Sequence, residues 1–203
     1  MSKAIKLAAV LAAAALTLAA CGSDSDTNGG SSSSTSKHND ADVEFAQDMI
    51  PHHAQAIVMS TMAKQQARDP KLRQLAADIQ AAQGPEIEQM SGWLKEWDED
   101  VPQGMPGMGG DSDDDMGDMG SMGGDGDMPG MMTGQQMMDL DESSGFGFDR
   151  MWLQMMIEHH EGAIEMAQVE QRDGQSMDAI ELAKAIESAQ TEEIALMESM
   201  LGS

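Results

Sequence analysis

The sequence contains little cysteine, few aromatic residues and little positive charge. Its 203 residues include one Cys and no Tyr, and aromatic residues make up 3%. A single Cys excludes an intramolecular disulfide framework and any zinc site with several Cys ligands. Lys and Arg number 11 against 36 Asp and Glu, which gives a net charge of −25. Such a charge repels phosphate backbones, so nucleic-acid binding is close to excluded.

Methionine, with 22 residues, is abundant instead. Ten of these lie in residues 101–147, among Gly, Asp, Ser and Pro. This composition cannot build a hydrophobic core, so it predicts a disordered Met-rich linker. Several of its methionines form Met-x-x-Met pairs, whose thioethers favour Cu(I). They predict weak linker metal sites at Met105, Met108, Met116, Met119 and Met122.

The first twenty residues are typical of a signal peptide. Two Lys precede an apolar run too short to span a membrane permanently. The run ends in Leu-Ala-Ala-Cys-Gly, which resembles the bacterial lipoprotein signal and implies a lipid anchor at Cys21. An ordinary signal peptide with an incidental Cys is the alternative. Residues 21–40 are nearly devoid of apolar side chains, so we expect a flexible tether in which His38 is solvated.

The rest of the chain contains an internal repeat. Residues 42–94 align with 149–201 at a constant offset of 107, without a gap and with 18 identities in 53 positions. The identities include the pairs His52/His159 and His53/His160. Such a repeat indicates the duplication of one structural unit. We assign residues 41–100 to unit 1 and residues 148–203 to unit 2.

Each unit is predicted to be a hairpin of two helices. Apolar residues recur at spacings of three, four and seven, and no strand-like alternation competes. Asp69 followed by Pro70 in unit 1, and Ser176 in unit 2, are expected to cap the second helices. The predicted helices span 42–67, 70–98, 149–173 and 177–201. Neither hairpin can bury its apolar face alone, so the sequence predicts an all-α four-helix bundle.

Polar side chains interrupt the apolar faces at matching positions of both units. On the first helices, histidines lie between methionines, and the candidate metal ligands are His52, His53, Met49, Met59, His159, His160, Met156 and Met166. On the second helices, a Glu and a Gln lie within the apolar stripe, at Glu86, Glu193, Gln83 and Gln190. A buried carboxylate needs a partner. We therefore predict a metal bound by His and Met, with the carboxylate accepting the outer imidazole N–H.

The ligand types favour copper over other metals. Thioether sulfur is a soft ligand that selects Cu(I), whereas zinc prefers Cys. The di-iron bundle signature needs Glu-x-x-His, but Glu158 directly precedes His159. An EF-hand loop starting at Asp111 would need Gly and Glu where Met116 and Met122 stand. No Gly-rich phosphate loop or nucleophile elbow is present.

Structural interpretations compete with this metal site. A methionine stripe at helical spacing can be core filler, and His–Glu contacts can form a polar network that fixes helix register. Glu44, Glu165 and Glu170 are interpreted as a solvated charged face. Pro51 precedes the first His pair while Glu158 precedes the second, so the two sites are expected to differ.

Both units resemble a known bacterial family. The segment from Met49 to Met59, that from Phe148 to Met166, and the Gln-x-x-Glu-Ile-x-x-Met that follows each are similar to the domain of unknown function 305 family. The resemblance implies a ferritin-like four-helix bundle. It also implies an extracytoplasmic copper-binding protein, with ligands His52, His53, Met59, His159, His160 and Met166.

Together these observations predict a lipid-anchored extracytoplasmic protein that sequesters, buffers or transfers Cu(I), with tolerance of Ag(I) and a copper-transfer protein as partner. We expect no enzymatic activity. One alternative is a redox enzyme, a copper or iron oxidase on the same bundle. The other is a metal-free binding module whose Met-rich linker consumes oxidants.

Overall fold

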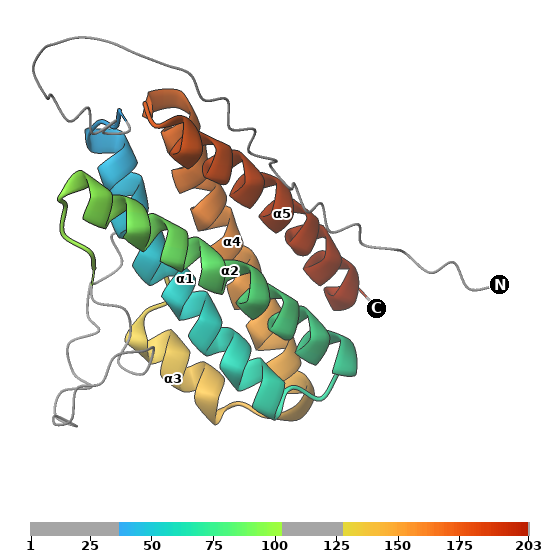
Figure 1. Cartoon of the computed structure of the whole chain (residues 1–203). Coiled ribbons are helices and arrows are strands. Elements are labelled where there is room, and N and C mark those ends of the chain that lie inside the picture. Colours follow the sequence, from blue (N-terminus) through green and yellow to red (C-terminus); the bar gives the residue numbers. More distant parts are fainter. Residues whose placement is uncertain (1–36, 103–127, 203) are drawn as a thin grey trace, which may run out of the picture. The chain divides into compact units, whose positions relative to one another are not determined.

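The computed structural model describes residues 37–102 and 128–202, which form helices and no strands. The helices are α1 (Asp40–Gln66), α2 (Pro70–Trp97), α3 (Gly134–Glu142), α4 (Gly145–Asp173) and α5 (Met177–Leu201) (Figure 1). The predicted all-α class is confirmed. Among these described helices, none combines the length and the apolar character needed to cross a membrane.

Local side-chain chemistry sets where the long helices begin. Asn39 caps α1 and forms a capping box with Asp42. The Asp69 side chain accepts from the Lys71 N–H at the start of α2, and the Ser176 side chain accepts from the Ala179 N–H at the start of α5. The caps predicted for the two second helices are thus confirmed, because both side chains satisfy N–H groups that the helix itself leaves unpaired.

The long helices form two hairpins that meet along their first helices. α1 packs on α2, α4 packs on α5, and α1 packs on α4, as the blue-green and orange-red pairs in Figure 1 show. The short α3 packs against α4. This arrangement places the histidine-bearing helices of both repeat units side by side, so the two His pairs can approach one another.

The two hairpins are joined by a reciprocal pair of caps. The Asp42 carboxylate of α1 accepts from the backbone N–H groups of Gln175 (3.0 Å) and Ser176 (2.8 Å), before α5. The equivalent residue of α4, Asp149, accepts from the backbone N–H groups of Arg68 (2.8 Å) and Asp69 (2.9 Å), before α2. The first helix of each hairpin, α1 or α4, thus binds the loop between the two helices of the other hairpin.

The core consists of two clusters of buried side chains, each drawn from both hairpins. One contains Phe148, Trp152 and Leu72, and the other contains Phe45 and Ile186. Trp152 is fully buried, and its indole N–H donates to the Met59 carbonyl at 2.8 Å. Because this bond crosses from α4 to α1, it fixes the register of the two histidine-bearing helices.

The prediction of disorder throughout residues 101–147 is wrong for residues 128–147. Residues 128–132 form a short segment, here called the strap, and α3 follows it. Thr133 and Gln136 form a capping box at the start of α3, and Met132 and Leu140 are buried in the core. The average composition of the linker hides these features, since one cap and two anchors suffice to order a short helix against an existing core.

The tether prediction is also wrong at its last residues. The His38 ring stacks on Trp97, with ring centroids 4.6 Å apart, so it is not a solvated side chain. Cys21 and the predicted signal peptide lie outside the described residues, as do Met105, Met108, Met116, Met119 and Met122.

Candidate metal centre

Four fully buried histidines form the centre of the interface between α1 and α4. His52 and His53 come from α1, and His159 and His160 come from α4. The rings of His52 and His159 have centroids 3.8 Å apart and are tilted by 38°, so they lie against each other across the interface. The His159 and His160 centroids are 6.4 Å apart. The duplicated motif therefore converges on one cluster, here called the histidine cluster.

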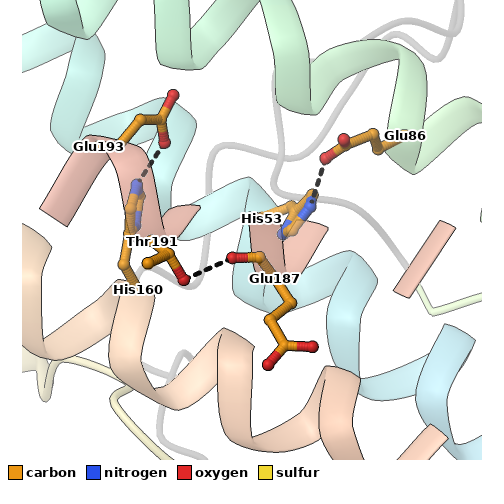
Figure 2. A network of polar contacts seen from close by, with 6 residues as sticks. All are labelled: His53, Glu86, His160, Glu187, Thr191 and Glu193. Carbon is orange, nitrogen blue, oxygen red and sulfur yellow. Dashed lines mark hydrogen bonds and ion pairs between the residues drawn. The ribbon is translucent and has the colours of Figure 1, made fainter. Parts of the chain in front are cut away.

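The outer member of each His pair binds a carboxylate of its own hairpin. The Nε2 atom of His53 lies 2.8 Å from Oε2 of Glu86 on α2, and Nε2 of His160 lies 2.7 Å from Oε2 of Glu193 on α5 (Figure 2). The imidazoles are fully buried, whereas the Glu side chains are 22% exposed. The predicted contact of carboxylate with imidazole is thus present in both hairpins.

These contacts determine which ring nitrogen carries the proton. A carboxylate accepts hydrogen bonds, so Nε2 donates in His53 and in His160. The neutral ring then has its lone pair on Nδ1, and both Nδ1 atoms are buried without a hydrogen-bond partner among the described residues. Metal-binding imidazoles typically have this arrangement, with one nitrogen held by an acceptor and the other left for the metal.

The inner histidines, His52 and His159, are held in the neutral form. Burial, and then the neighbouring His53, lowers the pKa of His52 to about 3. Burial, and then the adjacent His52, lowers the pKa of His159 well below its ordinary value of 6.5. A charged imidazole would lose its hydration here without gaining a counter-ion. Both rings therefore retain a lone pair at neutral pH, as metal coordination requires.

The inner histidines differ in their hydrogen bonds. Nε2 of His52 donates to the Pro129 carbonyl at 3.1 Å, and its Nδ1 has no hydrogen-bond partner among residues 37–102 and 128–202. Neither ring nitrogen of His159 has a hydrogen-bond partner in the part of the chain that is described. Unpaired buried nitrogens cost roughly 1–3 kcal/mol each. A metal ion coordinated by the histidine cluster would offset this cost, so the residues present fit such an ion.

The four predicted methionine ligands divide between the two core clusters. Met59 and Met156 lie in the cluster that contains Trp152, and Met49 and Met166 lie in the other. All are fully buried except Met166, which is partly buried. Each cluster therefore combines one methionine of α1 with one of α4, rather than the two of a single repeat unit.

The predicted Gln residues are buried on the second helices. Gln83 and Gln190 are each 3% exposed, and Oε1 of both lacks a hydrogen-bond partner within the described ranges. Each Gln precedes by three residues, just under one helical turn, the Glu that binds histidine. Among the described residues, no group of three or more His, Cys, Asp or Glu side chains is arranged to hold a metal ion, so methionine would have to complete a site.

The interpretation of Glu170 as a solvated residue is wrong. Its side chain is fully buried, and its carboxyl oxygens have no hydrogen-bond partner in the described segments. Burial, and then the neighbouring Asp42, raises the pKa of Glu170 to about 8. The equivalent position of unit 1 is Ala63, so the repeat offered no signal for a buried acid. Glu44 and Glu165 are exposed, as predicted.

The strap, which no motif of the sequence indicated, covers one side of the histidine cluster. Besides binding His52 through Pro129, it forms two hydrogen bonds between the backbone of Met132 and the side-chain amide of Gln55, at 2.7 and 2.8 Å. It passes so close to α4 that a Cβ on Gly162 would overlap the Pro129 carbonyl. The available signal was Gly162 itself, which replaces the Gln55 of the first unit within a helix.

Comparison with known proteins identifies the family. A model named Domain of unknown function (DUF305) matches residues 42–201, most of the chain and both repeat units. The chain belongs to the DUF305 family. The fold agrees with that of a DUF305 protein from Streptomyces coelicolor that is predicted to be secreted. That structure is 32% identical, with a TM-score of 0.66 over 80% of this chain and 92% of the other.

Solved structures of the copper-binding protein CopM share the DUF305 fold of this chain. The Cu(II)-bound form is 30% identical, with a TM-score of 0.61 over 79% of this chain and 95% of CopM. The Cu(I)-bound form is 26% identical, with a TM-score of 0.60. The uncharacterized protein L153 of Acanthamoeba polyphaga mimivirus is 42% identical over 55 residues, which is 36% of its length.

Proposed function

We propose that this DUF305 protein binds copper as Cu(I) and sequesters, buffers or transfers it outside the cytoplasm. The histidine cluster would supply imidazole ligands, and the fully buried methionines Met49, Met59 and Met156 would supply thioethers. Glu86 and Glu193 would orient the outer imidazoles. The function would be non-enzymatic, with copper as the cargo.

The observation that carries this proposal is the state of the four buried imidazoles. Each has an Nδ1 atom without a hydrogen-bond partner among the described residues, and the inner two, His52 and His159, are held neutral. A core chosen for stability alone would place apolar side chains here, since buried unpaired polar atoms destabilise the folded state. Neutral imidazole combined with thioether would suit Cu(I) better than Zn²⁺ or Mg²⁺.

The DUF305 relatives support the choice of metal and of compartment. CopM has been solved with Cu(I), Cu(II) and Ag, and the Streptomyces coelicolor relative is predicted to be secreted. For this chain we propose a lipid anchor at Cys21, a lower-affinity reservoir in the Met-rich linker, and transfer to a partner copper protein.

A Cu(I) competition titration against a chromophoric chelator tests this function. We expect His52→Asn combined with His159→Asn to weaken the tightest site by on the order of 100-fold, equivalent to roughly 2.7 kcal/mol of binding free energy. The matched control is His38→Asn, because His38 stacks on Trp97 and lies outside the cluster. That control should leave the tightest site unchanged.

A second variant addresses the linker. Replacement of its five paired methionines by Leu should remove weak Cu(I) equivalents and preserve the tightest one. If the double histidine variant retains the wild-type affinity, the histidine cluster is not the copper site. Histidine-dependent turnover of Cu(I) to Cu(II) in air would instead favour the oxidase.

A further inference from the structure

A pocket of about 230 Å³ lies on the outer side of the strap, between α1 and α4. Its lining includes two methionines, Met128 of the strap and Met166 of α4. It also includes three acidic residues, Glu44 and Asp48 on α1 and Glu170 on α4. The pocket therefore combines thioether sulfur with carboxylate oxygen, from three separate segments of the chain.

The methionines of this pocket are only partly buried, although Met166 also packs against a core cluster. Met59 of unit 1 is fully buried in the core, whereas its repeat equivalent, Met166, is only partly buried and lines the pocket. Met128 is also partly buried, at the point where the described part of the strap begins. A flexible thioether beside open space can turn toward a ligand without leaving a cavity in the core.

The acidic side chains distinguish this pocket from an apolar groove. Glu170 is fully buried, and both its carboxyl oxygens lack hydrogen-bond partners among the described residues. Glu44 and Asp48 lie one helical turn apart on α1, with no basic side chain in the lining that the structure gives. In a chain of net charge −25, Glu44 and Asp48 attract cations and would provide oxygen ligands next to the sulfurs, whereas Glu170 with its raised pKa is a neutral acid.

We propose that this pocket is an outer binding site for a soft monovalent cation, Cu(I) or Ag(I), in which Met128 and Met166 are the sulfur ligands. The choice of cation rests on the proposed function, while the site itself is separate from the histidine cluster. Pro129 connects the two, because it lines the pocket and its carbonyl accepts from His52. A cation in the pocket would thus share Pro129 as a neighbour with His52.

Site-resolved NMR with Ag(I) as the probe tests this outer site. In the full chain with ¹³C-labelled methionine methyl groups, Ag(I) should shift the Met128 and Met166 signals with one common midpoint. Because both sulfurs would bind the same ion, Met166→Leu should weaken the Met128 response at least tenfold. Met128→Leu should do the same to Met166. The control is Met138→Leu, since Met138 is 58% exposed on α3 and outside the pocket.

Different midpoints for the two methyl groups, or a Met128 response that is unchanged in Met166→Leu, would overturn the shared site. Combined replacement of Glu44 and Asp48 by their amides should weaken the response several-fold at low salt. An unaltered midpoint in that variant would also contradict the proposal.

A histidine variant separates this proposal from the proposed function. In His52→Asn/His159→Asn, the paired methyl response should persist, whereas its loss would show that the pocket is not an independent site. If the wild-type methionine methyl signals shift with Ag(I) but the imidazole signals do not shift with Cu(I), the proposed histidine site is wrong and the outer site is supported. If only the imidazoles respond, the outer site fails.

Discussion

The close approach of the strap to α4 gives a prediction whose sign differs from the usual effect of the same substitution. Gly162 lies within α4, where Gly→Ala ordinarily stabilises a helix by roughly 0.5–1 kcal/mol. A Cβ at this position, however, would lie 2.7 Å from the Gly130 nitrogen and closer still to the Pro129 carbonyl. Because both contacts are backbone atoms, Gly162→Ala must displace the strap.

The free-energy cost of this displacement comes from the hydrogen bonds that it breaks. The strap is held by one hydrogen bond from His52 to Pro129 and by two between Gln55 and Met132. At roughly 0.5–1.5 kcal/mol each, their loss outweighs the helix-propensity gain. We expect Gly162→Ala to lower the free energy of unfolding by about 2 kcal/mol, from the difference between these two effects.

Urea unfolding with a matched glycine control provides the assay. Gly92 is exposed within α2, and a Cβ there would have nothing within 4 Å. Gly92→Ala should therefore stabilise the protein by about 0.5–1 kcal/mol. If Gly162→Ala stabilises as much as Gly92→Ala does, the strap does not pack on α4 as described, and its cover of His52 is wrong.

Three further predictions concern the buried polar groups. The raised pKa of Glu170, about 8 against an ordinary 4.5, means that the folded protein holds a proton that the unfolded chain releases. The stability gained from this bound proton is thus complete below pH 4.5 and is lost as the pH rises toward 8, by on the order of a few kcal/mol. Glu170→Gln should remove this slope in urea titrations across that range, and an unchanged slope would refute it. Glu86→Gln and Glu193→Gln should each weaken Cu(I) binding roughly 10–100-fold, since a neutral amide orients imidazole less well. If the variants match the wild-type affinity in the chelator competition, these carboxylates do not orient metal-binding imidazoles. His159→Asn should weaken the tightest Cu(I) site more than His52→Asn does, because one nitrogen of His52 is already hydrogen-bonded to the strap. A larger loss of affinity in His52→Asn would contradict this.

Much of the fold could be predicted from the sequence because its signals are local and duplicated. The offset of 107 located both hairpins, and polar residues before apolar periodicity located the caps at Asp69 and Ser176. The contacts of Glu86 and Glu193 with histidine followed from a buried charge that requires a partner. These inferences needed only helical periodicity and the cost of burial.

What the sequence did not show depends on contacts between distant segments. The pairing of Met59 with Met156 in one core cluster arises from how α1 packs on α4, which no spacing within a unit specifies. The strap was hidden by the average composition of its segment, although Met132 and Leu140 anchor it and α3. Glu170 was assigned to solvent because its burial depends on packing beside Asp42 of the other hairpin.

The strap also changes what the duplication implies about the metal centre. The sequence predicted two separate, differing sites from two copies of one motif, yet the inner rings lie 3.8 Å apart in a single cluster. The strap binds this cluster from one side only, through positions that are equivalent in the repeat but differ in residue, Gln55 and Gly162. Had both positions carried Gln, the strap could not approach α4 so closely; had both carried Gly, it would lose its two amide hydrogen bonds. Divergence at this one pair of positions therefore makes the two His motifs chemically distinct, with His52 held by the strap and His159 left with both nitrogens unpaired among the described residues.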